Sequence, residues 1–326
     1  MSANYPIKFR PILKKRIWGG DKLVKVLNKK SQKINIGESW ELSGVEGDTS
    51  IVVNGKLKGK SLQYLMSTYK SSLVGKKVYK KFGERFPLLI KFIDAREALS
   101  IQLHPDDKLA KERHNSLGKT EMWYVMDADK EGNLIVGFKK NVTKEQYLEH
   151  LKNKSLLEIM NVDQVKKGDV YFIPAGRVHA IGAGVLLAEI QQTSDITYRV
   201  YDWNRVDDNG RSRELHTELA LDAIDYNARE QYKTNYNKTL NKSSNIIDCK
   251  YFTSNIISIE GEMDFDHSNK DSFVIYICVE GIVSIEFHMN KKVKLKKGET
   301  VLIPAELDNI TIASKGLSEL LEVYIK

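Results

Sequence analysis

The chain has 326 residues and a mass of 37.3 kDa, a length that fits one large domain or two modest ones. Hydrophobic residues make up 41% and charged residues 29% of the sequence, which excludes wholesale disorder and fibrous structure. The formal net charge is +8, because 51 Lys and Arg stand against 43 Asp and Glu.

The basic excess is spread along the whole chain, and no uninterrupted block of five or six basic residues occurs. The densest stretch, Lys291–Lys297, is interrupted by Val293 and Leu295 and predicts a strand edged with lysines. This dispersion argues against a nucleic-acid partner and favours a small anionic substrate.

Cysteine usage and hydropathy indicate the compartment. Cys249 and Cys278 are too few for a disulfide framework in a chain of this size, which fits a reducing environment. The first twenty residues lack the apolar core of a secretion signal, and no run approaches the roughly 20 apolar residues of a membrane span. We therefore expect a soluble cytoplasmic protein with no membrane partner.

Short β-branched and aromatic runs bounded by turn residues predict a mainly β core. In chain order, the predicted strands are Ser39–Leu42, Ser50–Val53, Leu88–Asp94, Leu99–His104, Glu121–Met126, Leu134–Phe138, Asp169–Ile173, Val185–Gln191, Phe273–Val279, Val283–Phe287 and Thr300–Ile303.

Three longer segments have apolar residues near helical spacing and predict helical insertions: Ser61–Phe82, Thr143–Met160 and Glu214–Ala228. Thr143 and Gln146 fit a capping box at the start of the second segment. The polar run Asn235–Ser244 predicts a boundary between two parts of the chain.

An internal repeat carries the domain prediction. Lys166–Ala175 recurs as Lys296–Ala305, each copy being a glycine turn, a short apolar strand and Pro-Ala. The preceding segments, Lys119–Phe138 and Lys270–Phe287, also correspond loosely. Self-similarity of this kind predicts two related β units, here residues 1–235 and 245–326.

The first copy of the repeat continues to His179, giving the pattern G-x5-P-x-G-x2-H from Gly168. This pattern resembles the second half of the cupin signature, which implies two cupin-like jelly-roll units with helical insertions. In the second copy Asn309 stands in place of His179, and Glu306 in place of Gly176. The second unit therefore resembles a barrel that has lost its metal ligand, and we expect one metal, in the first unit.

The remaining ligands are expected on neighbouring strands. Gln102 and His104 are two residues apart and share a face of a strand, as do Lys119 and Glu121. Together with His179, these residues offer an amide oxygen, two imidazoles and a carboxylate. That set suits Zn²⁺ and also accepts Fe²⁺, Mn²⁺ or Co²⁺.

Each of these residues also has a structural interpretation. His104 precedes a proline and fits a turn, Glu121 fits an exposed strand edge, and His179 fits a hydrogen-bonded core histidine. The combination of all three with the barrel signature favours a metal site. The other five histidines fit no such spacing and are interpreted as surface or structural residues: His114, His150, His216, His267 and His288.

Several segments resemble the type I mannose-6-phosphate isomerases, in particular their short bacterial form. They are Arg16–Gly20, Gly37–Ser43, Leu99–Asp107, Gly118–Tyr124, the His179 stretch and Gln192–Trp203. The resemblance implies a zinc enzyme, with one Zn²⁺ per chain, that interconverts mannose 6-phosphate and fructose 6-phosphate. It implies His104, Glu121 and His179 as ligands, with Gln102 a ligand in longer relatives, and it places Arg199 at the position of the family's active-site arginine.

Isomerisation of an aldose to a ketose moves a proton between C1 and C2 through an enediol, and needs an acid/base and an electrophile. Arg199 suits stabilisation of the enediolate, whereas Lys119 suits either an acid/base or a salt-bridge partner of Glu121. The substrate phosphate needs hydrogen-bond donors. The candidates are Lys91, Arg96, Ser100, Arg177, Arg199 and Arg205.

Two other classes of protein fit part of this pattern. A metal-dependent cupin dioxygenase would use a similar His/His/carboxylate set. A non-catalytic sugar-binding cupin would lack a ligand or Arg199, yet every expected position is filled. The Gly118–Trp123 and Thr197–Trp203 segments favour the isomerase. The sequence indicates no oligomeric state.

Overall fold

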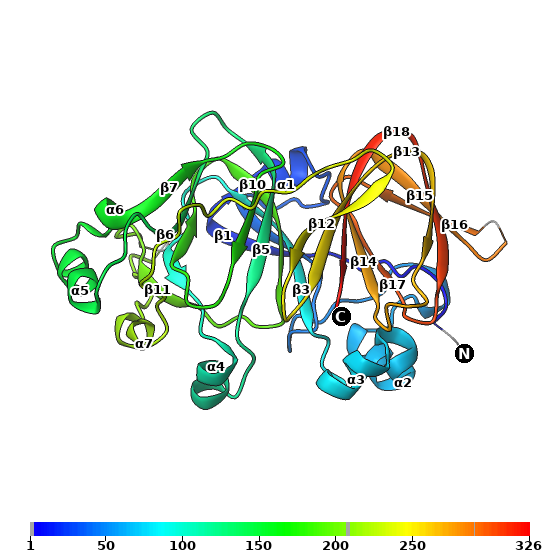
Figure 1. Ribbon diagram of the computed structural model, residues 1–326, viewed down its shortest axis with the longest axis horizontal. Coiled ribbons are helices and arrows are strands. Elements are labelled where there is room, and N and C mark those ends of the chain that lie inside the picture. The colour runs from blue at the N-terminus through cyan, green and yellow to red at the C-terminus, as the bar shows by residue number, and fades with distance from the viewer. Residues whose placement is uncertain (1–2, 207–208, 290) are drawn as a thin grey trace.

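The computed structural model describes residues 3–206, 209–289 and 291–326. The predicted mainly β class is confirmed, since three antiparallel sheets form the body of the molecule (Figure 1). The first is six-stranded, in the order β1 (Ile12–Gly20), β2 (Ile36–Leu42), β3 (Leu88–Ala95), β10 (Val185–Gln192), β5 (Glu121–Ala128) and β8 (Val170–Ile173).

A second, five-stranded sheet completes the N-terminal unit, in the order β11 (Tyr198–Tyr201), β4 (Ile101–Leu103), β9 (His179–Ile181), β6 (Asn133–Phe138) and β7 (Met160–Gln164). The C-terminal unit is a seven-stranded sheet of β12 (Lys242–Asp248), β13 (Thr253–Asp266), β18 (Asn309–Tyr324), β14 (Val274–Glu280), β17 (Thr300–Ile303), β15 (Ile282–Phe287) and β16 (Lys291–Lys296). Figure 1 shows the two units side by side.

The described helices all come from residues 22–221. They are α1 (Lys22–Lys25), the 3-10 turn η1 (Gly55–Leu57), α2 (Leu62–Val74), α3 (Lys76–Phe82), α4 (Asp107–His114), α5 (Lys144–Lys152), α6 (Leu156–Ile159) and α7 (Thr217–Leu221). Figure 1 shows α2 and α3 below the C-terminal unit. In the described part of the chain, none of these helices has the length and apolarity needed to cross a bilayer.

The N-terminal segment ties the two units together. Ile7 exchanges backbone hydrogen bonds with Leu302 of β17, and Phe9 forms an isolated bridge with Val52. One hydrophobic cluster also contains buried side chains from both units. The limits 1–235 and 245–326 stay a prediction, although β12 begins at Lys242, within the segment predicted as the boundary.

Four predicted elements differ from the structure. The predicted strand Ser50–Val53 is wrong, because this segment forms only isolated bridges and no strand runs alongside it. The predicted helix Thr143–Met160 divides into α5 and α6, since Lys154 adopts a left-handed φ of 58°, and Met160 begins β7. The helix predicted over Glu214–Ala228 is limited to α7.

The helix predicted over Ser61–Phe82 is broken at Gly75, which has a φ of 90°. A Cβ at this position would lie 2.0 Å from the carbonyl oxygen of Asp271 in the C-terminal unit. The Asp271 carboxylate in turn accepts hydrogen bonds from the backbone amides of Lys76 and Lys77, which begin α3. Gly75 thus permits close contact between the helical insertion and the C-terminal unit.

We expect Gly75→Ala to lower the free energy of unfolding by at least about 2 kcal/mol, because it adds a backbone clash to an unfavourable φ. Gly59→Ala is the matched control, since Gly59 has a similar φ of 87° and no atom within 4 Å of the added Cβ. Urea denaturation followed by circular dichroism measures both. Equal destabilisation by the two variants would contradict the proposed contact.

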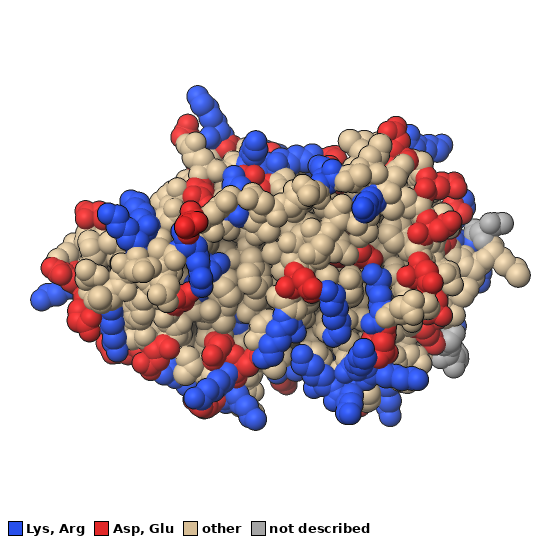
Figure 2. Space-filling model, viewed as in Figure 1, with Lys and Arg blue, Asp and Glu red and all other residues tan. Residues whose placement is uncertain are grey.

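Surface charge is mixed over most of the face in Figure 2, with acidic and basic side chains interspersed. Basic side chains gather in the lower part of this view, where α2 and α3 lie. The exposed lysines of α3 are Lys76, Lys77, Lys80 and Lys81. The absence of a nucleic-acid partner stays a prediction.

Candidate metal centre and its pocket

The three predicted ligands His104, Glu121 and His179 come together between the two sheets of the N-terminal unit. Their ligand atoms all lie within 4.8 Å of one another, and all three side chains are buried. Glu121 Oε2 lies 3.6 Å from His104 Nε2, and Glu121 Oε1 lies 3.5 Å from His179 Nε2. Among the described residues, this is the only cluster of three such side chains with metal-ligand spacing.

Strand pairing explains this convergence. Glu121 begins β5 in the six-stranded sheet, whereas His179 begins β9 and His104 directly follows β4 in the five-stranded sheet. In that second sheet, Gln102 pairs with both His179 and Arg199 on the neighbouring strands. The facing sheets therefore bring together residues from positions 102 to 199.

The ligand atoms lack hydrogen-bond partners. His104 Nε2, His179 Nε2 and both carboxylate oxygens of Glu121 are buried and make no hydrogen bond. Buried polar atoms are normally paired, so four such atoms without a hydrogen bond converging on one point fit a bound cation, although Glu121 Oε2 also lies 3.3 Å from Lys119 Nζ. The other nitrogens are held: His104 Nδ1 lies 2.8 Å from the Ile196 carbonyl oxygen, and His179 Nδ1 lies 2.8 Å from that of Arg177. Donation from Nδ1 leaves each Nε2 with a free lone pair directed toward the group.

The electrostatic environment favours the metal-binding forms of both histidines. Burial lowers the pKa of His179 to about 4, and burial followed by the charge of Lys119 lowers the pKa of His104 well below its usual value. Both imidazoles are then neutral near pH 7. Burial, followed by the Glu189 carboxylate, raises the pKa of Glu121 to about 7, while Lys119 opposes that rise. A cation would compensate the buried Glu121 carboxylate.

The other predicted site residues also lie here. Lys119 is buried, and its Nζ lies 3.3 Å from Glu121 Oε2. Gln102 lines the adjoining pocket and its Oε1 accepts a hydrogen bond of 3.2 Å from the Ser100 hydroxyl. Coordination by Gln102 stays a prediction.

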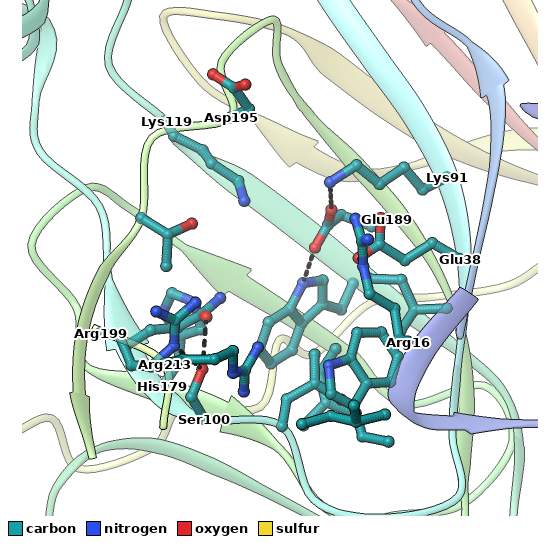
Figure 3. Close-up of a pocket in the computed structure, with 18 of the residues that line it drawn as sticks. Arg16, Glu38, Lys91, Ser100, Lys119, His179, Glu189, Asp195, Arg199 and Arg213 are labelled. Carbon is teal, nitrogen blue, oxygen red and sulfur yellow. Dashed lines mark hydrogen bonds and ion pairs between the residues drawn. The ribbon is translucent and has the colours of Figure 1, made fainter. Parts of the chain in front are cut away.

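A pocket of about 440 Å³ opens beside the ligand group (Figure 3). At one end, Arg199 donates through Nε to Ser100 Oγ over 3.3 Å and through Nη1 to the Glu214 carbonyl over 2.8 Å. Arg213 lies beside Arg199 in this view. Burial, followed by the charge of Arg213, lowers the pKa of Arg199, so positive charge is concentrated at this end.

The opposite wall holds a buried ionic network. Lys91 Nζ lies 3.0 Å from Glu189 Oε1, and the Trp123 indole donates to Glu189 Oε2 over 3.0 Å. The Trp123 ring contacts the His179 ring edge-on, with centroids 5.2 Å apart. This network therefore packs directly against a candidate ligand.

Three of the cations predicted to bind phosphate do not line this pocket. Arg177 donates to the Phe172 carbonyl oxygen and lies over the Tyr232 ring. Arg205 is held by Asp202 and the Ala98 carbonyl oxygen, and Arg96 contacts Asn35 and Glu97 at the surface. Lys91, Ser100 and Arg199 do line the pocket.

Residue-by-residue reasoning did not identify several pocket residues: Arg16, Glu38, Trp40, Glu189, Asp195 and Arg213. Glu189 was detectable, because it is a charged residue within the otherwise uncharged buried strand β10. Alternation along β2 also places Glu38 and Trp40 on one face. No sequence pattern marks Arg213 as a pocket residue, because it lies in an irregular segment after β11.

A buried His–Glu–His group between two sheets of a mainly β fold defines a cupin enzyme with a candidate metal centre. Comparison with known proteins gives the family. Residues 7–147 match the model of the catalytic domain of type I phosphomannose isomerase, and residues 242–324 match the cupin domain of mannose-6-phosphate isomerase. The chain belongs to the type I mannose-6-phosphate isomerases and is an isomerase, which confirms the predicted family, cupin fold and enzyme class.

Individual relatives cover from two thirds of the chain to nearly all of it. Mannose-6-phosphate isomerase ManA of Bacillus subtilis is 34% identical over 306 residues, covering 92% of this chain and 93% of the relative. A crystal structure of the mannose 6-phosphate isomerase from Bacillus subtilis superposes with a TM-score of 0.89 at 32% identity, covering 98% of this chain and 99% of that one. The mannose-6-phosphate isomerase of Streptococcus mutans is 37% identical over 219 residues, covering 67% of each chain.

Proposed function

We propose that this enzyme interconverts mannose 6-phosphate and fructose 6-phosphate at the pocket beside His104, Glu121 and His179, with one Zn²⁺ per chain. The four buried ligand atoms without hydrogen-bond partners carry the proposal. Nitrogen and carboxylate donors without sulfur suit a zinc ion that keeps an open position for substrate. Bound zinc would supply a Lewis acid that polarises the sugar oxygens at C1 and C2.

Lys119 is the proposed proton carrier. It is buried, it lines the pocket, and Figure 3 shows its side chain extending into the space between the two ends of the pocket. Among the described residues, its ion pair is with Glu121, a candidate ligand. An ammonium group beside the reacting carbons can donate a proton, and the amine can accept one.

Arg199 is the proposed stabiliser of the enediolate. Its guanidinium is oriented by Ser100 and by the Glu214 carbonyl, so it needs little reorganisation when negative charge develops. Because an arginine keeps its proton, it acts by charge and hydrogen bonding and leaves proton transfer to another group.

Arg213 is the proposed main contact of the substrate phosphate, with Ser100 and Arg199 beside it. Asp202 orients the Arg213 guanidinium through two hydrogen bonds: its Oδ2 accepts from Nε over 2.8 Å, and its Oδ1 accepts from Nη2 over 2.6 Å. The pocket end therefore presents two adjacent guanidinium groups, the arrangement that suits a phosphate dianion.

Replacing Arg213 with glutamine is expected to raise the KM for mannose 6-phosphate about 10-fold to 100-fold, with a smaller change in kcat, because ground-state binding of the phosphate is lost. Steady-state kinetics measures both constants. Arg96→Gln is the control, since Arg96 lies at the surface outside the pocket. A fall in kcat at unchanged KM would contradict this assignment.

A coupled assay tests the function itself. The zinc-loaded enzyme should form fructose 6-phosphate from mannose 6-phosphate without O₂, and removal of the metal by a chelator should abolish turnover reversibly. Binding of the sugar phosphate without turnover would favour a non-catalytic cupin. A requirement for O₂ would favour the dioxygenase.

We also propose that the enzyme acts in the cytoplasm. Both cysteines are free, and the proposed substrates are charged metabolites. Cell fractionation followed by immunodetection tests this location, and recovery of the protein outside the cytoplasmic fraction would contradict it.

A further inference from the structure

A second pocket, of about 810 Å³, lies where the two units meet. The N-terminal unit contributes residues near β1, the loop after α1 and Glu41 of β2, and the C-terminal unit contributes the turn between β16 and β17. Six cations line this junction pocket: Lys8, Arg10, Lys29, Lys30, Lys296 and Lys297.

Among the described residues, two carboxylates line the same pocket, and both are already paired. Glu41 lies 2.6 Å from the Nζ of the buried Lys29, which also donates to the Gly298 carbonyl oxygen. Glu299 lies 2.8 Å from the Nζ of Lys8. The lining therefore keeps a surplus of positive charge that its own acids do not balance.

Three of the cations provide that surplus. Arg10, Lys30 and Lys296 are exposed, and in the described structure their side chains form no ion pair or hydrogen bond. They come from three separate segments, so the fold, and not a run of basic residues, brings them to one pocket. Like charges placed together cost free energy unless an anion offsets them.

The rest of the lining is suited to an organic molecule. Phe9, Pro11, Leu13, Leu27 and Val53 supply an apolar surface beside the cations. The buried Thr300 also lines the pocket, and its hydroxyl oxygen has no hydrogen-bond partner. Apolar walls, a few polar groups and this volume are the features of small-molecule sites.

We propose that the junction pocket binds a small organic molecule that carries at least two phosphate-type negative charges. The charges lie against Arg10, Lys30 and Lys296, and the organic part lies against the apolar wall. This site is separate from the catalytic pocket, with which it shares no lining residue.

Isothermal titration with magnesium pyrophosphate tests the proposal on the zinc-loaded full-length enzyme. Wild type should bind at two sites, the catalytic pocket and the junction pocket. The triple variant R10Q/K30Q/K296Q should lose one of the two events, with affinity weakened at least tenfold, and Arg213→Gln should weaken the other. The triple variant K76Q/K77Q/K80Q on α3 removes the same charge from the surface and should keep both events.

Three outcomes would overturn the proposal. In the first, wild type shows a single binding event, which Arg213→Gln alone removes. The two triple variants would weaken binding equally, which would indicate diffuse attraction by net charge. Alternatively, R10Q/K30Q/K296Q would keep both events unchanged. Circular dichroism of each variant confirms that it is folded before titration.

Discussion

His179→Ala is expected to remove the metal and the activity together. The variant deletes one of the three candidate ligands and leaves two protein donors, fewer than the three that hold a catalytic zinc. We expect the metal content to fall below about one tenth of an ion per chain and turnover to fall at least about 1000-fold, since loss of an outer-shell partner alone costs about 10-fold to 100-fold. Elemental analysis and the coupled assay measure the two quantities on one sample.

The appropriate control is His150→Ala, because His150 lies on the surface helix α5, where its Nδ1 contacts Ser155 Oγ. It should keep both metal and turnover. A His179→Ala enzyme that kept stoichiometric metal would show that the ion is held elsewhere. Glu121→Gln provides a second test, since it keeps the size of the side chain while removing the carboxylate charge.

The His104–Glu121–His179 group was predictable because its spacing follows from local geometry. A glycine turn, a short apolar strand and Pro-Ala place His179 at the start of a strand, as the signature requires. The two-residue spacing of Gln102 and His104 also matches the structure, where Gln102 lies in β4 and His104 directly follows it. The local sequence pattern is enough to predict where a side chain lies when its position is fixed by the strand that carries it.

The residue of the C-terminal unit that corresponds to Glu121 was harder to predict from the sequence. Matching Lys119–Phe138 to Lys270–Phe287 sets Glu121 close to Ser272. Strand pairing gives a different equivalence, because Glu121 pairs with Ile173 whereas Val274 pairs with Ile303, the matching residue of the repeat. An apolar valine therefore takes the place of the candidate carboxylate ligand in the C-terminal unit. Register is set by long-range pairing, which a loose sequence match does not resolve.

The pocket walls depend on tertiary contacts. Arg213 reaches the pocket because Asp202, eleven residues earlier, holds its guanidinium. Arg96 and Arg177 looked equally suitable for phosphate by residue type, but each is directed to partners elsewhere. Dependence on tertiary contacts also explains why a helix was wrongly predicted through Gly75. The close contact that requires a glycine there comes from Asp271 in the other unit.

Arg199→Ala is expected to keep the metal and the fold while it lowers kcat about 100-fold to 1000-fold, the usual cost of removing one donor aimed at a developing oxyanion. The prediction rests on the position of Arg199. It lies beside Gln102 on the adjacent strand and lines the pocket, but it is not one of the three candidate ligands. Steady-state kinetics, elemental analysis and thermal melting are measured on one preparation. Arg229→Ala is the control, since Arg229 is an exposed cation outside the pocket.

Separate measurement of kcat and KM distinguishes the two possible roles of Arg199, stabilising the enediolate and holding the phosphate. A residue that stabilises only the enediolate lowers kcat and kcat/KM by the same factor, whereas one that only holds the phosphate raises KM. Arg199 contacts Ser100 at the proposed phosphate end of the pocket, yet it pairs with the strand of the candidate ligand Gln102. We therefore expect the larger effect on kcat for Arg199→Ala and the larger effect on KM for Arg213→Gln. Wild-type turnover in Arg199→Ala would remove its catalytic assignment, and equal effects of both variants on KM alone would place both guanidinium groups on the phosphate.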